Sequence, residues 1–101
     1  MRVGPADEMQ VGEVRRLVLG GTPVALFRLQ DGFFAIGDTC SHAEASLSEG
    51  EVDAGAGEVT CERHGARFDI RTGKNRSLPA TRPVPRFPAR VVEGQVEVEM
   101  E

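Results

Sequence analysis

The sequence predicts an all-β protein of 101 residues, built from short antiparallel strands. Helical patterns are nearly missing, and the best candidate, residues 6–9, is a single turn too short to stand alone. From residue 12 onward, short apolar or alternating runs are separated by turn residues, as is typical of antiparallel β proteins. Several of these separators contain glycine, which permits tight reversals between paired strands.

The first half of the chain predicts three consecutive strands. Residues 13–19 end at Gly20-Gly21 and residues 23–29 follow, which predicts a hairpin with a tight glycine turn. A second turn at 30–32 then leads into a strand at 33–36. Phe27 or Ile36 is expected to cover a second face of this sheet. The first face is expected to hold Leu17, Leu19, Val24, Leu26 and Phe34.

The second half predicts shorter elements. Residues 40–50 form a loop with Leu47 as its apolar anchor, and short strands are expected at 51–52, 58–60 and 68–70. Four prolines between residues 79 and 88 predict an extended connector, because proline cannot donate a ladder hydrogen bond. A closing hairpin is expected from residues 87–92 and 96–100.

All cysteines and histidines of the chain fall in one short window, as two pairs: Cys40 with His42, and Cys61 with His64. Two metal centres fit these ligands. One is a single tetrahedral zinc, and the other is a two-iron, two-sulfide cluster with one iron on the cysteines and one on the histidines. Zinc fingers usually place both cysteines in the first pair, so the mixed pairs favour the two-iron centre. A disulfide between the cysteines would leave both histidines unexplained.

The spacing Cys40-x-His42 with Cys61-x-x-His64-Gly65 resembles the Rieske motif. The resemblance continues through Phe68-Asp69, through residues 71–74 and through Leu78-Pro79-Ala80, and is strongest to the small Rieske ferredoxins of aromatic-ring dioxygenase systems. It implies a Rieske-like antiparallel β-sandwich or barrel, in a single domain over residues 1–101. A small cluster-binding β subdomain is expected at about residues 38–78.

The resemblance also implies a cofactor and its ligands. One [2Fe-2S] cluster per chain is expected, with a ligand set of Cys40, His42, Cys61 and His64. High-potential Rieske proteins carry an additional cysteine in each ligand loop, at places that correspond to Ala45 and Arg63 here. They also carry hydroxyl donors to sulfur where this chain has Ala66 and Phe68. We therefore expect a reduction potential at the low end of the Rieske range of roughly −150 to +300 mV.

As a function, the resemblance implies a carrier of single electrons. It would take them from an NAD(P)H-dependent flavoprotein reductase to a terminal non-haem iron oxygenase. We expect no enzymatic activity of its own, because no histidine remains for a 2-His-1-carboxylate iron site once both have bound the cluster. The alternative from another class is a structural zinc module with two cysteine and two histidine ligands that binds a partner.

Composition excludes several further classes of function. The formal net charge is −4 and the isoelectric point is about 5.2, which argues against nucleic acid as a partner. Some of the basic residues after His64 are candidates for docking an acidic partner surface. No apolar stretch approaches the length of a membrane helix and the N-terminus has no signal-peptide core, so we expect a cytoplasmic protein without membrane contact. We also expect a monomer.

Overall fold

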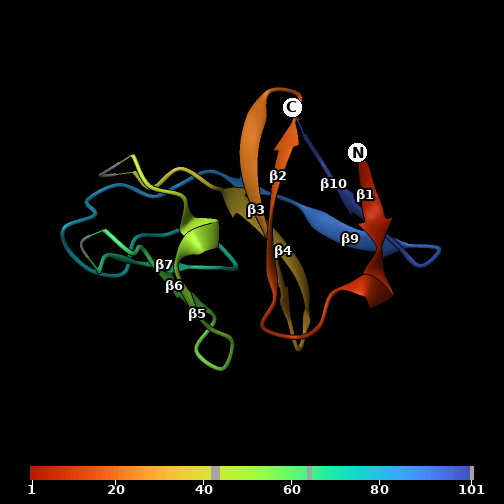
Figure 1. Cartoon of the computed structure of the whole chain (residues 1–101), viewed down its shortest axis with the longest axis horizontal. Coiled ribbons are helices and arrows are strands. Elements are labelled where there is room, and N and C mark those ends of the chain that lie inside the picture. Colours follow the sequence, from red (N-terminus) through yellow and green to blue (C-terminus); the bar gives the residue numbers. More distant parts are fainter. Residues whose placement is uncertain (42–43, 64, 101) are drawn as a thin grey trace.

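The computed structural model describes residues 1–41, 44–63 and 65–100, and over these residues the chain forms three antiparallel sheets. A four-stranded central sheet has a three-stranded sheet on either side of it along the longest axis (Figure 1). The regular elements of the described residues are ten strands and two short 3-10 helices. The predicted all-β, antiparallel class is confirmed.

The central sheet has the order β2-β3-β4-β8, with bounds β2 Val14–Leu19, β3 Thr22–Leu29, β4 Gly32–Gly37 and β8 Arg86–Phe87. The predicted hairpin is present, and its turn residues Gly20 and Gly21 have φ angles of 57° and 82°. Two consecutive positive φ angles match the right-handed twist of the flanking strands and are accessible to glycine at little cost.

An end sheet of order β1-β10-β9 contains a strand that the sequence did not predict. β1 Arg2–Pro5 pairs with β10 Gln95–Val98, which also pairs with β9 Ala89–Val92. The prediction of one strand over residues 87–92 was wrong. Pro88 separates β8 from β9, and the two pieces pair in different sheets, which agrees with the missing N–H donor of proline.

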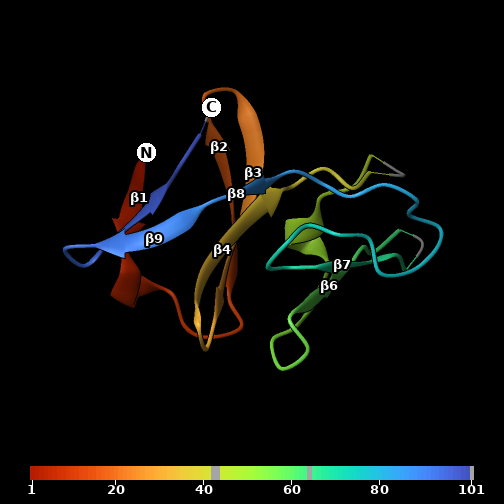
Figure 2. The ribbon, with the colours of Figure 1, turned by 180° about the vertical axis from the view of Figure 1, so that it is seen from behind.

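The small sheet on the other side of the molecule has the order β5-β6-β7, with bounds β5 Glu51–Asp53, β6 Glu58–Thr60 and β7 Arg67–Asp69. A 3-10 turn, η2 Leu47–Glu49, leads into β5, and a similar turn, η1 Ala6–Glu8, follows β1. After β7 the chain passes around the outer end of this sheet and returns to the central sheet as β8 (Figure 2).

Two hydrophobic clusters lie on opposite faces of the central sheet. The end-sheet cluster contains Met9, Val24, Leu26, Phe33, Ala35, Val96 and Val98. The small-sheet cluster contains Ala25, Phe27, Leu29, Ile36, Cys40, Leu47, Val59, Cys61, Ala66, Phe68, Ile70, Ala80 and Val84. Leu17 and Leu19 pack on the first cluster as predicted, and Phe27 and Ile36 cover the second face as predicted.

The placement of Phe34 was wrong by one residue. Phe34 lies opposite Phe27 across the β3–β4 ladder and packs on the small-sheet cluster, whereas Ala35 lies opposite Leu26. Side chains alternate between faces along a strand, so a shift of one position exchanges the two faces. The sequence Phe33-Phe34-Ala35-Ile36 is apolar at every position and carries no alternation that would fix the face.

Candidate metal centre

The first predicted ligand, Cys40, lies in a loop that closes on itself directly after β4. Its side chain is buried, with 4% exposure, and its main-chain N–H donates to the carbonyl of Ala45 at 2.9 Å. Thr39 and Ser46 form an isolated bridge, and Leu47 anchors the loop in the core as predicted. The main chain thus fixes the position of Cys40 from both sides of the loop.

The second predicted ligand, Cys61, directly follows β6 and is fully buried. Its N–H donates to the carbonyl of Ala66 at 2.7 Å, and its carbonyl accepts from the N–H of Gly65 at 3.1 Å. Gly65 has a φ of 74°, a backbone conformation that favours glycine.

Both cysteines belong to the small-sheet cluster, although they come from different loops. No disulfide joins Cys40 to Cys61, and both residues are within the described part of the chain. The other two predicted ligands, His42 and His64, lie outside the described residues. The fold thus brings two thiols from separate loops into one buried cluster.

A third segment, the proline-rich run after the second loop, is tied to both neighbours. The hydroxyl of Ser41, next to Cys40, donates to the carbonyl of Arg82 at 2.6 Å. The amide of Asn75 donates to the carbonyl of Ala80 at 3.1 Å, and Val84 donates through its N–H to Gly73 at 2.9 Å. Ala80 and Val84 are buried in the same hydrophobic cluster as the cysteines, so this segment packs against the candidate site.

Two buried carboxylates, Asp38 and Asp69, flank the cysteine segments, and the sequence predicted burial for neither of them. Burial tends to raise the pKa of Asp38, but hydrogen bonds from Ser48, Ser46 and Arg16 outweigh it and hold that pKa below its usual value. Burial also tends to raise the pKa of Asp69. Hydrogen bonds from Arg76 and two main-chain amides outweigh this effect, so the pKa of Asp69 is lowered. The sequence offered one signal, an aspartate two residues before Cys40.

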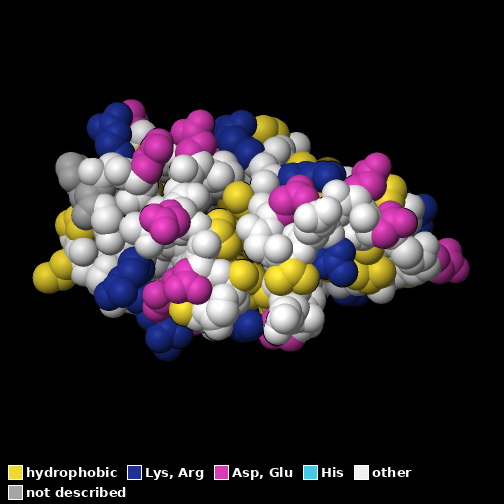
Figure 3. Space-filling model, turned by 60° about the horizontal axis from the view of Figure 1, so that its bottom comes forward, with side chains coloured by type: hydrophobic (Ala, Val, Ile, Leu, Met, Phe, Trp, Pro, Cys, Tyr) yellow, Lys and Arg dark blue, Asp and Glu magenta, His cyan; other side chains and the backbone are white. Residues whose placement is uncertain are grey.

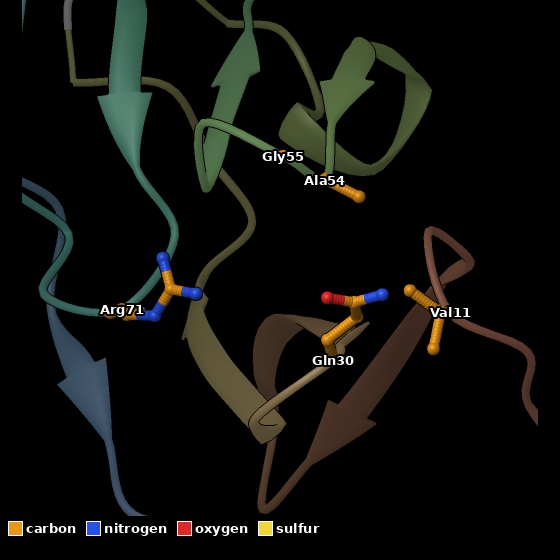
Figure 4. A pocket seen from close by; sticks show the side chains of 5 residues that line it. All are labelled: Val11, Gln30, Ala54, Gly55 and Arg71. Atoms are coloured by element: carbon orange, nitrogen blue, oxygen red, sulfur yellow. The ribbon is translucent and has the colours of Figure 1, made fainter.

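A pocket of about 240 Å³ lies on the side of the small sheet, between the β5–β6 turn and the β3–β4 turn (Figure 4). It is lined by Val11, Gln30, Ala54, Gly55 and Arg71, and neither cysteine takes part. The Arg71 guanidinium is already paired with both carboxylate oxygens of Asp31, at 3.0 and 2.8 Å. The pocket therefore offers no evident chemistry, and the cysteine cluster remains the candidate site.

Charged side chains of both signs are interspersed over the face in Figure 3, with hydrophobic side chains between them. This mixture agrees with the weakly negative net charge of the chain. Among the described residues, no helix has the length and apolar character needed to cross a lipid bilayer.

Comparison with known proteins identifies the family to which this arrangement belongs. Residues 1–88 match the family described as the Rieske [2Fe-2S] domain. The chain belongs to this family. Its cofactor is therefore a [2Fe-2S] cluster, and the buried thiols on two loops fit the sulfur donors that such a cluster requires. The matches give no support to the zinc alternative.

Three similar proteins match this Rieske protein over nearly its whole length. The anthranilate 1,2-dioxygenase ferredoxin subunit of Burkholderia cepacia is 46% identical over 96 residues, covering 95% of this chain and 87% of that protein. The ferredoxin of carbazole 1,9a-dioxygenase from Nocardioides aromaticivorans IC177 has a TM-score of 0.96 at 34% identity, covering 100% of this chain and 97% of that one.

The third similar protein comes from a complex of a ferredoxin with an oxygenase. A chain from the complex of reduced oxygenase and oxidized ferredoxin in carbazole 1,9a-dioxygenase has a TM-score of 0.90 at 41% identity, covering 98% of this chain and 100% of that one. The predicted resemblance to Rieske ferredoxins of dioxygenase systems is confirmed, and so is the Rieske-type fold.

Proposed function

We propose that this Rieske protein carries single electrons from an NAD(P)H-dependent flavoprotein reductase to the terminal non-haem iron oxygenase of an aromatic-ring dioxygenase system. The observation that carries the proposal is the match, over nearly the whole chain, to a ferredoxin subunit of such a system at 46% identity. A further similar ferredoxin has been seen in complex with its oxygenase. The chain is thus a carrier component with no substrate chemistry of its own.

The proposal assigns the cluster ligands as Cys40, His42, Cys61 and His64, with the thiolates on one iron and the imidazoles on the other. A cluster held by these residues would supply reversible one-electron redox chemistry. Neutral imidazoles leave the oxidised centre uncharged, and this makes reduction easier than with four thiolates. Cys40 and Cys61 contribute buried thiol donors, and the closed loops around them keep both donors in place.

The remaining parts of the proposal concern organisation and location. Residues about 38–78 act as the cluster-binding subdomain of a single domain, and the chain works as a monomer in the cytoplasm, where thiols stay reduced. Brief docking to two partners in turn suits a small interface.

The test begins with the purified protein as isolated. We expect a red-brown sample with acid-labile sulfide and the electron paramagnetic resonance signal of a reduced Rieske cluster. Cys40→Ser and Cys61→Ser are each expected to lose that signal, whereas Glu44→Gln, at an exposed position in the first loop, should retain it. A colourless, redox-silent protein containing zinc would overturn the proposal.

The electron-transfer role needs a separate test. The holoprotein is combined with an NADH-dependent flavoprotein reductase and a terminal aromatic-ring oxygenase, and product formation is followed with and without the Rieske protein. Turnover that requires the Rieske protein supports the proposal. The proposal would be contradicted if none of the tested reductases reduced the protein and the reduced protein passed electrons to none of the tested oxygenases.

A further inference from the structure

Two charged side chains of the described residues are buried, Asp38 and Asp69, and each is paired with an arginine. Asp38, only 1% exposed, accepts from the Nε of Arg16 at 3.0 Å, and Asp69 accepts from Arg76. Burying a carboxylate is costly unless charge and hydrogen bonds compensate for it. Each aspartate therefore stays buried and charged only while its surroundings keep their present arrangement.

Asp38 joins both ends of the loop that contains Cys40. Its Oδ1 accepts from the N–H of Ser48 at 2.9 Å, and its main-chain carbonyl accepts from the N–H of Leu47 at 2.7 Å. Its own N–H donates to the carbonyl of Pro23 in β3 at 3.1 Å. One residue thus connects the start of the loop, the end of the loop and the central sheet.

The arginine partner adds a second connection to the central sheet. Arg16 lies in β2, opposite Ala25 of β3, and reaches Asp38 from there. Its side chain is 49% exposed, so it brings charge to a buried carboxylate without being buried itself. An ion pair to the central sheet therefore holds the base of the first cysteine loop, two residues before Cys40.

Asp69 makes the same kinds of interaction, but the turn that it closes contains no predicted cluster ligand. Its Oδ1 accepts from the N–H groups of Arg71 and Thr72, at 2.8 and 3.1 Å. Its own N–H donates to the carbonyl of Lys74 at 2.8 Å. Asp69 therefore closes the turn after β7, and the chain supplies a matched pair of buried aspartates that differ in what they enclose.

We infer that Asp38 is a positioning residue for the first ligand loop of the cluster and that Arg16 is its charge partner. The inference rests on the proposed role of Cys40 as a ligand. A loop preorganised by Asp38 presents its cysteine in the binding geometry before the cluster arrives and resists opening afterwards. The pair also places a fixed negative and a fixed positive charge in the surroundings of a centre that gains one electron.

The first test measures how fast the holoprotein loses its cluster, from the decay of visible absorbance in the presence of an iron chelator. Asp38→Asn is expected to lose the cluster about tenfold faster than wild type, which corresponds to about 1.4 kcal/mol. Asp69→Asn, the matched control, is expected to lose it at nearly the wild-type rate. Equal rates for the two variants would overturn the inference.

The second test separates a charge effect from simple loosening of the fold. Asp38→Asn removes a negative charge and should raise the midpoint potential, whereas Arg16→Gln removes a positive charge and should lower it. The half-exposed side chain of Arg16 makes Arg16→Gln a surface change, so this variant tests the pair even where Asp38→Asn folds poorly. Shifts in the same direction would overturn the assignment of the pair.

Failure of the inference is distinct from failure of the proposed function. Wild-type protein without acid-labile sulfide would overturn both. A stable cluster in wild type and in Asp38→Asn alike would overturn the positioning role alone and leave the electron-carrier proposal standing.

Discussion

The two faces of the central sheet support different parts of the molecule. On one face, Leu26 and its neighbours pack against the end sheet, and no cysteine of the described chain belongs to that cluster. On the other face, Ile36 belongs to the cluster that contains Cys40 and Cys61. With the proposed ligands Cys40 and Cys61, hydrophobic packing and cofactor ligation share residues on this face only, so the stability of this face is expected to depend on the bound [2Fe-2S] cluster.

The largest expected effect comes from equal truncations on the two faces. Leu26 and Ile36 are both buried and lie on neighbouring strands, with Ala35 and Ala25 opposite them. Leu26→Ala and Ile36→Ala should each lower the free energy of unfolding by about 2–5 kcal/mol, measured by urea denaturation. Only Ile36→Ala is expected to speed loss of the [2Fe-2S] cluster at urea concentrations well below the unfolding transition.

The difference between the two faces would be rejected if Leu26→Ala and Ile36→Ala lost the [2Fe-2S] cluster at the same rate at equal loss of stability. The cluster would then report on global unfolding, and the small-sheet side would have no separate opening of its own.

A smaller effect is expected from a close backbone contact on the cluster side. A β-carbon at Gly50 would overlap the carbonyl oxygen of Thr60, which directly precedes Cys61. Gly50→Ala should therefore displace the second cysteine segment and cost about 1–3 kcal/mol in the free energy of unfolding. Gly55→Ala is the control, because its β-carbon would meet Asp53 at an ordinary 3.6 Å.

Thermal unfolding and cluster retention of both glycine variants test this contact. Equal behaviour of Gly50→Ala and Gly55→Ala would show that the backbone near Thr60 yields without consequence for the site.

Local patterns made the central hairpin and the predicted ligands visible in the sequence. Gly20-Gly21 specifies a tight turn by its own backbone freedom, and the ligand spacing is a property of the chain alone. β1 was missed because Arg2–Pro5 has no alternation and becomes a strand only by pairing with β10, near the other end of the chain. Such non-local pairing leaves no local trace in the sequence.

The candidate site shows the same limit. Asp38 is an ordinary loop aspartate in the sequence, and its role depends on Arg16, which lies twenty-two residues earlier and reaches it across the fold. Phe34 was assigned to the wrong face because an unbroken apolar run does not specify its register. The sequence therefore predicted the two cysteines that the fold brings into one buried cluster, but not the ion pair at the base of the first cysteine loop.

A still smaller effect, dependent on pH, is expected at Asp69. Its pKa is lowered in the folded protein, so its interactions stabilise the fold above the ordinary aspartate pKa of about 4, and that contribution is lost as the pH falls below it. Asp69→Asn should cost about 1 kcal/mol at pH 7, with wild type and variant converging in acid.

Urea unfolding of wild type and Asp69→Asn over a series of pH values measures this difference, because changes common to both proteins cancel. A gap in stability that widened below pH 4 would have the wrong sign and would reject the ion pair with Arg76 as its source.

The smallest expected change is in potential, and it separates the faces without truncating a side chain. Ala66 and Ala35 are both buried. Ala66 lies in the small-sheet cluster with the two cysteines, and Ala35 lies in the end-sheet cluster. If a hydroxyl at position 66 donates to a cluster sulfur, it stabilises the reduced form more than the oxidised form. A difference of about 1 kcal/mol corresponds to roughly 40 mV in a one-electron couple. Voltammetry should therefore show a higher midpoint potential for Ala66→Ser and an unchanged one for Ala35→Ser, since the second hydroxyl lies across the central sheet. Equal shifts in both variants would mean that the potential follows general polarity of the core, and the low potential expected for this chain would need another cause.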